Sequence, residues 1–283
     1  MARACHTILG KRKPRLRTDS RSTEAYAGDF TYEFTHGGGS CRVKLTAAQT
    51  AALDKSVAPA RMGTYLASAG NDADRARALY LWDRTLSAAF MADLAMLEVA
   101  LRNAMNAQLV AKWGPQWFSR VDVALDERSS RALAEAWRRS APNRSPDRMV
   151  AQCMFGFWRG LLDKGDHVGA EPRRVRCDYE QQLWRGVLDK AFPGGKAQAA
   201  LDGERWNRSY ALAVVSRVND LRNRVAHHEP LVNGFPLTGQ QVRRTAQEAH
   251  EDCMRLAAML DRDLASLLHT TSSVPSVLAG RPH

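Results

Sequence analysis

An arginine, an amide and a histidine stand close together in the chain, at Arg222, Asn223 and His227. Asn223 and His227 are four residues apart, which places them on nearly the same face of a helix, and the long side chain of Arg222 reaches toward that face. An imidazole exchanges a proton near neutral pH, and a guanidinium holds phosphate oxygens and stabilises the charge that builds on them. These residue types at this spacing therefore suit cleavage of an RNA phosphodiester bond.

A helix must position these side chains and must end beside them. The residues that precede the motif carry an apolar stripe at spacings of three or four residues, made of Tyr210, Val214, Val218, Leu221 and Val225. Pro230 lacks an N–H and clashes with a preceding helical turn, so the helix is predicted to stop near His227 or His228. His228 is rotated by about 100° from His227 around the helix and is predicted to have a supporting role. Basic side chains are also common in last helical turns, where they complement the helix dipole, so a structural role for the whole motif stays open.

A second group of polar residues, Glu98, Arg102 and Asn103, lies on an otherwise apolar predicted helix. Glu98 and Arg102 are four residues apart in the favourable order for an ion pair. We favour this self-contained pair as structural support that fixes the register of packed helices. The alternative is that one of the three residues reaches Arg222 and His227 and orients them.

Arginines near Pro172 are candidates for contact with RNA phosphates. Three of them cluster in the predicted loop, at Arg173, Arg174 and Arg176, and Arg224 is a fourth candidate beside the histidine motif. A basic loop is more often simply solvated. An exposed Trp158 would suit stacking on RNA bases, but its helical spacing with neighbouring apolar residues favours core packing.

The elements that carry these residues are predicted to be helical. The expected helices cover residues 46–55, 58–69, 72–113, 127–139, 147–163, 179–191, 196–200, 205–227 and 238–268. Asn71 is predicted to cap the long helix, and Gly114-Pro115 is predicted to end it. Packing of helix on helix is the architecture that this pattern implies.

The two ends of the chain are predicted to differ from this helical part. Residues 1–44 are predicted to be a basic, mostly disordered extension, in which alternating apolar residues around Gly37-Gly38-Gly39 allow a short hairpin. Residues 45–270 are predicted to be one helical domain. The remaining residues, 271–283, show no core pattern and are predicted to be a flexible tail.

Composition favours a polyanionic partner and argues against several classes of protein. The formal net charge is +11, of which residues 1–44 contribute +5 from nine Lys/Arg and four Asp/Glu. Plain arginine-rich composition is an equally good explanation of this surplus. The five cysteines include no C-x-x-C pair, so neither a disulfide framework nor a zinc site is indicated. This cysteine usage fits a reducing cytoplasm best. No apolar run is long enough to span a membrane, which argues against an intramembrane protease.

The motif also carries a resemblance to a known family. Arg222-Asn223-x-x-x-His227 resembles the R-(polar)-x-x-x-H signature of HEPN-domain ribonucleases, and residues 221–230 (LRNRVAHHEP) are similar to the hallmark of their Abi-like, or abortive infection, branch. Segments 78–83 (ALYLWD), 97–104 (LEVALRNA) and 155–162 (FGFWRGLL) follow the order of that family. The likeness extends from about Leu45 to Leu268.

This resemblance implies an all-α, HEPN-like helical bundle with extra N-terminal helices. It implies a metal-independent endoribonuclease without a cofactor, acting in antiphage defence or as a toxin. Cleavage would proceed through the RNA 2′-hydroxyl, with His227 as acid/base, Arg222 as phosphate clamp and Asn223 as positioning amide. The implied partners are RNA, a second copy of the chain in a homodimer, and an antitoxin or a phage-derived trigger. The alternative is a HEPN-like RNA-binding or regulatory protein that keeps the motif and does not cut.

Overall fold

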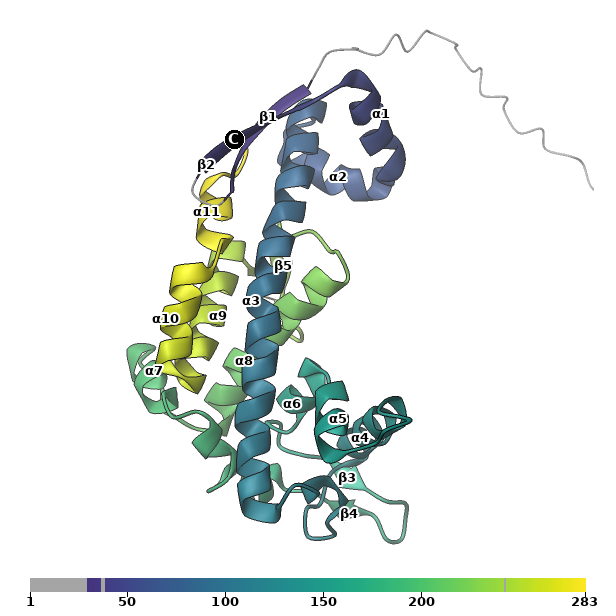
Figure 1. The fold of residues 1–283 in the computed structure, drawn as a ribbon, viewed down its shortest axis with the longest axis vertical. Coiled ribbons are helices and arrows are strands. Elements are labelled where there is room, and N and C mark those ends of the chain that lie inside the picture. Colours follow the sequence, from purple (N-terminus) through teal and green to yellow (C-terminus); the bar gives the residue numbers. More distant parts are fainter. Residues whose placement is uncertain (1–29, 37–38, 242) are drawn as a thin grey trace, which may run out of the picture.

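In the computed structural model, the described residues are 30–36, 39–241 and 243–283. They are mostly helical, as the sequence predicts (Figure 1). The α-helices are α1 (Ala47–Ser56), α2 (Pro59–Ser68), α3 (Ala73–Trp113), α4 (Glu127–Arg139), α5 (Pro146–Gln152), α6 (Phe155–Gly160), α7 (Gly195–Leu201), α8 (Arg208–Ala226), α9 (Ala246–Leu260), α10 (Arg262–Thr271) and α11 (Val274–Ala279). Shorter helical segments are η1 (Trp117–Ser119), η2 (Glu180–Trp184) and η3 (Leu188–Ala191). Strands pair antiparallel as β1 (Phe30–His36) with β2 (Gly39–Leu45), β3 (His167–Val168) with β4 (Val175–Arg176), and β5 (Phe235–Pro236) with β6 (Arg243–Arg244).

Helix α3 is the central support and runs through most of the height of the molecule in Figure 1. The side chain of Asp72 starts it by accepting the N–H of Arg75 at 2.9 Å, and Gly114 ends it at a φ of 85° that suits glycine. The predicted apolar face is buried, namely Leu79, Trp82, Leu86, Phe90, Leu94, Leu97, Leu101 and Met105. The prediction that Asn71 caps this helix is wrong. Asn71 lies in a left-handed turn, with φ at 68°, and the next residue supplies the capping oxygen.

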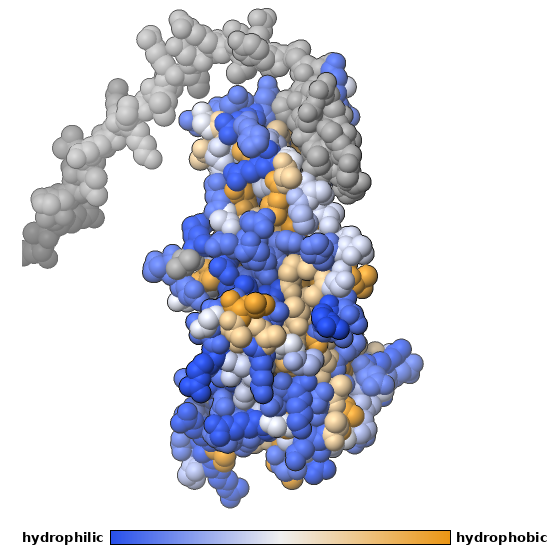
Figure 2. Space-filling view, turned by 90° about the vertical axis from the view of Figure 1, so that its left-hand side faces the viewer, coloured by the Kyte–Doolittle hydropathy of each residue, from blue (hydrophilic) through white to orange (hydrophobic). Residues whose placement is uncertain are grey.

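The other helices gather around α3. Helices α8, α9 and α11 contact it directly, and α8 also contacts α6 and α9. In Figure 1, α9, α10 and α11 lie on one side of α3, and α4, α5 and α6 lie on the other. Figure 2 views the side that carries α9 and α10, whose surface is mostly hydrophilic with a few apolar patches. Trp158 is fully buried, which confirms core packing for this residue.

Five predicted helices are confirmed with small shifts of their ends. The ranges 46–55, 58–69, 127–139, 196–200 and 205–227 correspond to α1, α2, α4, α7 and α8. The largest shift is at the start of α8, which begins after Asn207. The side-chain oxygen of Asn207 accepts the N–H of Tyr210 at 2.9 Å, so it caps the helix at that point.

The prediction of one helix over 147–163 is wrong. Helix α5 ends before Cys153, and α6 begins at Phe155 after two residues of extended backbone. The N–H of Phe155 donates to the carboxylate of Glu98 at 3.0 Å instead of continuing the helical ladder. A side chain from another helix therefore stabilises the break.

Two more predicted helices are interrupted. Over 179–191, the π-helical η2 and the 3-10 helix η3 are separated by Gly186, whose φ is 75°. Over 238–268, a loop and β6 come first, because the capping box of Thr245 and Glu248 starts α9 only at Ala246. Asp261 then ends α9 and caps α10.

The N-terminal hairpin is present in the described part of the chain. Strands β1 and β2 pair from Phe30 opposite Leu45 to His36 opposite Gly39. Residues 1–29, for which disorder is predicted, and the two turn glycines at 37 and 38 lie outside the described residues. Strand β1 contacts both α3 and α11, so the hairpin joins the two ends of the described chain.

The expectation that no core pattern follows Thr270 is wrong. Helix α11 buries Val274 and Val277 against the core. The indole N–H of Trp82 in α3 donates to the carbonyl of Val277 at 2.7 Å. A short helix with two buried valines and one buried hydrogen bond is thus enough to hold this segment on α3.

Candidate catalytic site

The end of α8 has the geometry predicted from Pro230. The helix stops at Ala226, and His227 is its C-terminal cap. The N–H of His228 donates to the carbonyl of Val225 at 3.0 Å, and the N–H of Glu229 donates to that of Arg224 at 2.9 Å. These two bonds form a Schellman motif, which satisfies the last carbonyls of the helix.

His228 occupies the left-handed position of this motif. Its φ is 57°, in a conformation that glycine usually supplies at the end of a helix. His227, one residue earlier, has an ordinary negative φ of −92°. Both histidine side chains are exposed. The two rings therefore leave the backbone from different conformations.

Arg222 is held by a carboxylate from another helix. Its Nε lies 3.4 Å from Oε2 of Glu98 in α3, and both side chains are partly buried. The other carboxylate oxygen of Glu98 accepts the N–H of Phe155 at the start of α6. One glutamate thus fixes Arg222 to α3 and the first turn of α6 together. Among the described residues, the terminal guanidinium nitrogens of Arg222 have no hydrogen-bond partner and remain available to a ligand.

The predicted ion pair between Glu98 and Arg102 does not form among the described residues. Helices α3 and α8 run antiparallel, which brings Glu98 to Arg222 instead. Arg102 makes a long contact of 3.4 Å from its Nε to Oδ1 of Asn103. The preference for a self-contained pair was therefore wrong, because the spacing rule considers one helix alone and a second helix supplies the cation. Asn103 is exposed, and neither it nor Arg102 bonds to the motif within the described chain.

The remaining motif residues differ in whether their side chains contact other residues of the protein. Asn223 and His227 are exposed on α8, with no side-chain hydrogen bond among the described residues. Arg224 is engaged, because its Nη1 lies 2.6 Å from Oε2 of Glu229 and its guanidinium stacks over the ring of Phe235 at 5.9 Å. Arg224 and Glu229 therefore hold the chain reversal after α8, and this pairing competes with the predicted phosphate contact of Arg224.

Sequence patterns did not single out Asp83, the residue that anchors the chain just after α8. Asp83 of α3 is buried, and its two oxygens accept the hydroxyl of Tyr65 at 2.8 Å and the N–H of Leu231 at 2.9 Å. Burial raises the pKa of Asp83 to about 6, and these donors together with the N–H of Val232 oppose the rise. A carboxylate in an apolar helical stripe was the available signal, since such a group needs partners.

The predicted arginine loop forms the small hairpin of β3 and β4. Arg173, Arg174 and Arg176 are all exposed, and none has an ion pair within the part of the chain that the structure describes. No hydrogen bond or ion pair between described residues joins this hairpin to the end of α8. The structure therefore places these arginines on a separate element from Arg222 and His227.

The described residues offer neither a metal cluster nor a membrane-spanning helix. They contain no group of three or more His, Cys, Asp or Glu side chains arranged to hold a metal ion. None of their helices is long and apolar enough to cross a membrane. Cys153, Cys177 and Cys253 are free thiols inside the core.

Replacing Glu98 tests whether it organises the site. Glu98→Ala removes the acceptor of the Phe155 N–H and the partner of Arg222, so we expect a loss of about 1–2 kcal/mol in the free energy of unfolding. Glu98→Gln keeps one carbonyl acceptor and is expected to recover at least half of that loss. Urea denaturation followed by circular dichroism measures both variants. Equal stability of the Ala variant and the wild type would show that the contact contributes nothing.

Comparison of the chain with protein-family models, with curated proteins and with solved structures finds no match.

Proposed function

We propose that this chain is a metal-independent endoribonuclease of the Abi-like HEPN type, serving in antiphage defence or as a toxin. The observation that carries the proposal is the end of α8. There, Arg222 is oriented through its Nε by Glu98, beside exposed Asn223 and His227. A phosphate clamp, an amide and a proton-transfer group thus lie within one and a half helical turns. The bundle itself is helical, as a HEPN fold requires.

The chemistry follows from the positions of the three side chains. The free terminal nitrogens of Arg222 bind the non-bridging oxygens of the scissile phosphate and stabilise the charge that builds on them. His227 transfers the proton, either from the attacking 2′-hydroxyl or to the leaving 5′-oxygen. Asn223, one turn before His227, hydrogen-bonds the ribose or phosphate and holds the RNA in line. The products are a 2′,3′-cyclic phosphate and a 5′-hydroxyl.

A second copy of the chain completes the proposal. Cleavage needs a base and an acid, and two molecules supply two histidines. An apolar stripe on α3 is exposed beside Glu98 and offers a surface for that copy, formed by Ala88, Met91, Ala92, Ala95, Met96 and Val99. Burial of this stripe between two α3 helices places both α8 ends near the same interface. A protein that cuts RNA at full rate as a monomer contradicts the dimer.

The Glu98–Arg222 pair also favours one alternative. Because Glu98 neutralises part of the charge on Arg222, the motif can serve a HEPN-like RNA-binding or regulatory protein without cleavage. In that case Arg222 fastens α8 to α3, and RNA affinity does not depend on His227. The two functions differ in whether His227-dependent products exist.

Expression in a bacterial host separates these functions. Induction of the wild type is expected to arrest growth and to leave cellular RNA with cyclic-phosphate 3′ ends. Arg222→Ala and His227→Ala, at matched protein levels, are expected to restore growth and to remove those ends. His228→Gly is the matched control and is expected to stay toxic, since glycine suits its backbone conformation. Identical growth and RNA ends for all four proteins, with and without phage infection, would overturn the proposal.

A further inference from the structure

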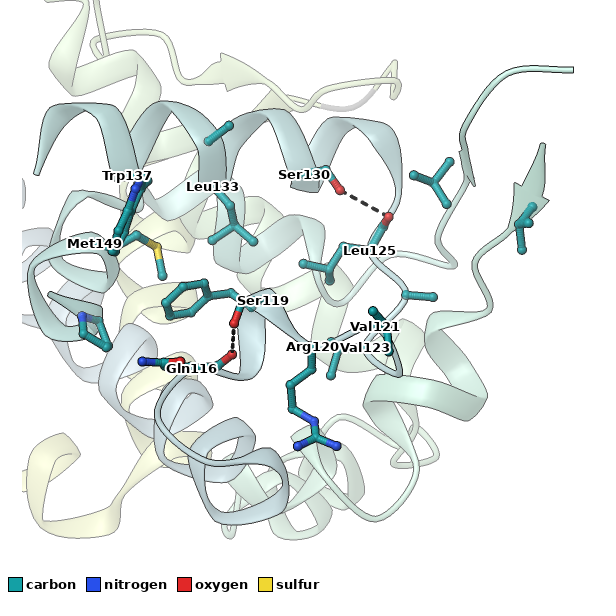
Figure 3. A pocket seen from close by; sticks show the side chains of 16 residues that line it. Gln116, Ser119, Arg120, Val121, Val123, Leu125, Ser130, Leu133, Trp137 and Met149 are labelled. Atoms are coloured by element: carbon teal, nitrogen blue, oxygen red, sulfur yellow. Dashed lines mark hydrogen bonds between the residues drawn. The ribbon is translucent and has the colours of Figure 1, made fainter. Parts of the chain in front are cut away.

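A large apolar pocket lies away from the end of α8, between η1, α4, the start of α5 and the β3–β4 hairpin. Its volume is about 920 Å³, within the range of small-molecule sites. Figure 3 shows Leu125, Leu133, Trp137 and Met149 among the side chains that line it. Its other apolar lining residues include Phe118, Val123, Val168 and Val175. The candidate catalytic site uses none of these side chains.

The hydroxyl groups and the charged group of the lining have partners within the protein. The hydroxyl of Ser119 donates to the carbonyl of Gln116 at 2.9 Å, and that of Ser130 donates to the carbonyl of Leu125 at 3.3 Å (Figure 3). Arg120, the one charged lining residue, is engaged by both carboxylate oxygens of Asp122 at 2.7 and 2.9 Å. Among the described residues, no lining side chain has a buried polar atom without a partner, and the lining suits an apolar body.

A positive charge without a counterion among the described residues lies on Arg144, which packs against the lining residue Trp137. The guanidinium of Arg144 lies over the ring of Trp137, 5.9 Å from its centroid, and its Nε donates to the carbonyl of Trp137 at 3.3 Å. Its terminal nitrogens have no partner among the described residues. No carboxylate lines the pocket, and the exposed arginines of the β3–β4 hairpin add positive potential nearby. An anionic group at the Trp137 end is therefore favoured.

From these contacts we propose that the pocket binds a fatty acid, with its hydrocarbon chain between α4 and η1 and its carboxylate on Arg144. The apolar walls bury the chain, which is the main source of affinity. The planar guanidinium holds the carboxylate through two parallel hydrogen bonds. The preference for an anion over a neutral molecule of the same length comes from this contact alone.

Calorimetric titration of the full chain with sodium decanoate, below its micelle concentration, tests the site. We expect one molecule bound per chain, and about tenfold weaker binding of decan-1-ol, which lacks the charge. Arg144→Gln is expected to lower the affinity for decanoate about tenfold, to the level of the alcohol. Arg131→Gln, which changes an exposed arginine on α4, is expected to leave the affinity for decanoate unchanged.

A charge placed in the pocket provides the decisive variant. Ala134 lines the pocket but is itself exposed, so Ala134→Glu leaves the core intact. We expect this variant to keep the wild-type circular dichroism spectrum and to lose detectable decanoate binding. No binding by the wild type, binding at several sites per chain, or unchanged binding by a folded Ala134→Glu variant would each overturn the proposal. Equal wild-type affinity for decanoate and the alcohol would overturn the role of Arg144.

Discussion

Purified protein carrying His227→Ala is expected to cleave single-stranded RNA at least about 100-fold more slowly than the wild type, the scale of a lost acid/base group. Arg222→Ala is expected to cost about 100- to 1000-fold, because the charge on the phosphate loses its main stabilising partner. Initial rates on an end-labelled RNA, with analysis of the 3′ ends of the products, measure both effects. Chelation of divalent cations with EDTA is expected to leave the wild-type rate unchanged.

The neighbouring histidine supplies the control for this prediction. His228→Gly relaxes a left-handed backbone position, so the variant is expected to be as stable as the wild type or up to about 1 kcal/mol more stable. Its cleavage rate is expected to stay within a few-fold of the wild-type rate. A large loss of rate in His228→Gly with little loss in His227→Ala would show that His228, and not His227, is the acid/base group.

The second large effect is expected at Asp83, which fastens the chain after α8 to α3. Asp83→Ala leaves the hydroxyl of Tyr65 and the N–H of Leu231 buried without an acceptor. We expect the free energy of unfolding to fall by about 3 kcal/mol at pH 4.5, from two or more unsatisfied donors. Asp54→Ala, which breaks an exposed ion pair with Arg77, is the matched control and is expected to cost less than about 1 kcal/mol. Equal losses in both variants would remove the anchoring role of Asp83.

The effect of Asp83 is also expected to depend on pH. Its pKa is about 6 in the folded protein and 3.8 in the ordinary, solvated state, so the folded protein holds the proton more tightly. Stability from this group is therefore fully present below pH 3.8 and is lost as pH rises through 6. The difference in unfolding free energy between wild type and Asp83→Ala is expected to shrink by roughly 2 kcal/mol from pH 4 to pH 7. A difference that grows with pH would contradict the raised pKa.

Local chemistry made several parts of this structure predictable. The end of α8 follows from Pro230 alone, and the length of α3 follows from its apolar period and Gly114. The break between α5 and α6 was not predictable in this way, because Phe155 leaves the helical ladder for Glu98, which is 57 positions away in the chain. The cap of α3 was missed by one residue, since Asn71 and Asp72 are both good capping residues and only the turn decides between them.

In the candidate site, too, local spacing predicts some features, and contacts between distant segments decide the others. The proximity of Arg222, Asn223 and His227 follows from helical spacing within one segment. The partner of Arg222 does not, because Glu98 had an equally good cation four residues along its own helix. Asp83 was overlooked for a related reason. Its partners are a tyrosine from α2 and a backbone N–H beyond α8, and no spacing rule connects them.

The large sequence separation of these contacts determines when the site forms. Glu98 and Arg222 are 124 positions apart, Asp83 and Leu231 are 148 apart, and Trp82 and Val277 are 195 apart. Each contact requires closure of a long loop, whose entropy must be overcome before the contact contributes. During synthesis, α3 leaves the ribosome well before α8 and α11, so the parts of α3 that these two helices contact stay uncovered until each helix has been made. The chain therefore cannot place Arg222 against Glu98 before α8 has been made, and the motif is organised later than the local turns of α3.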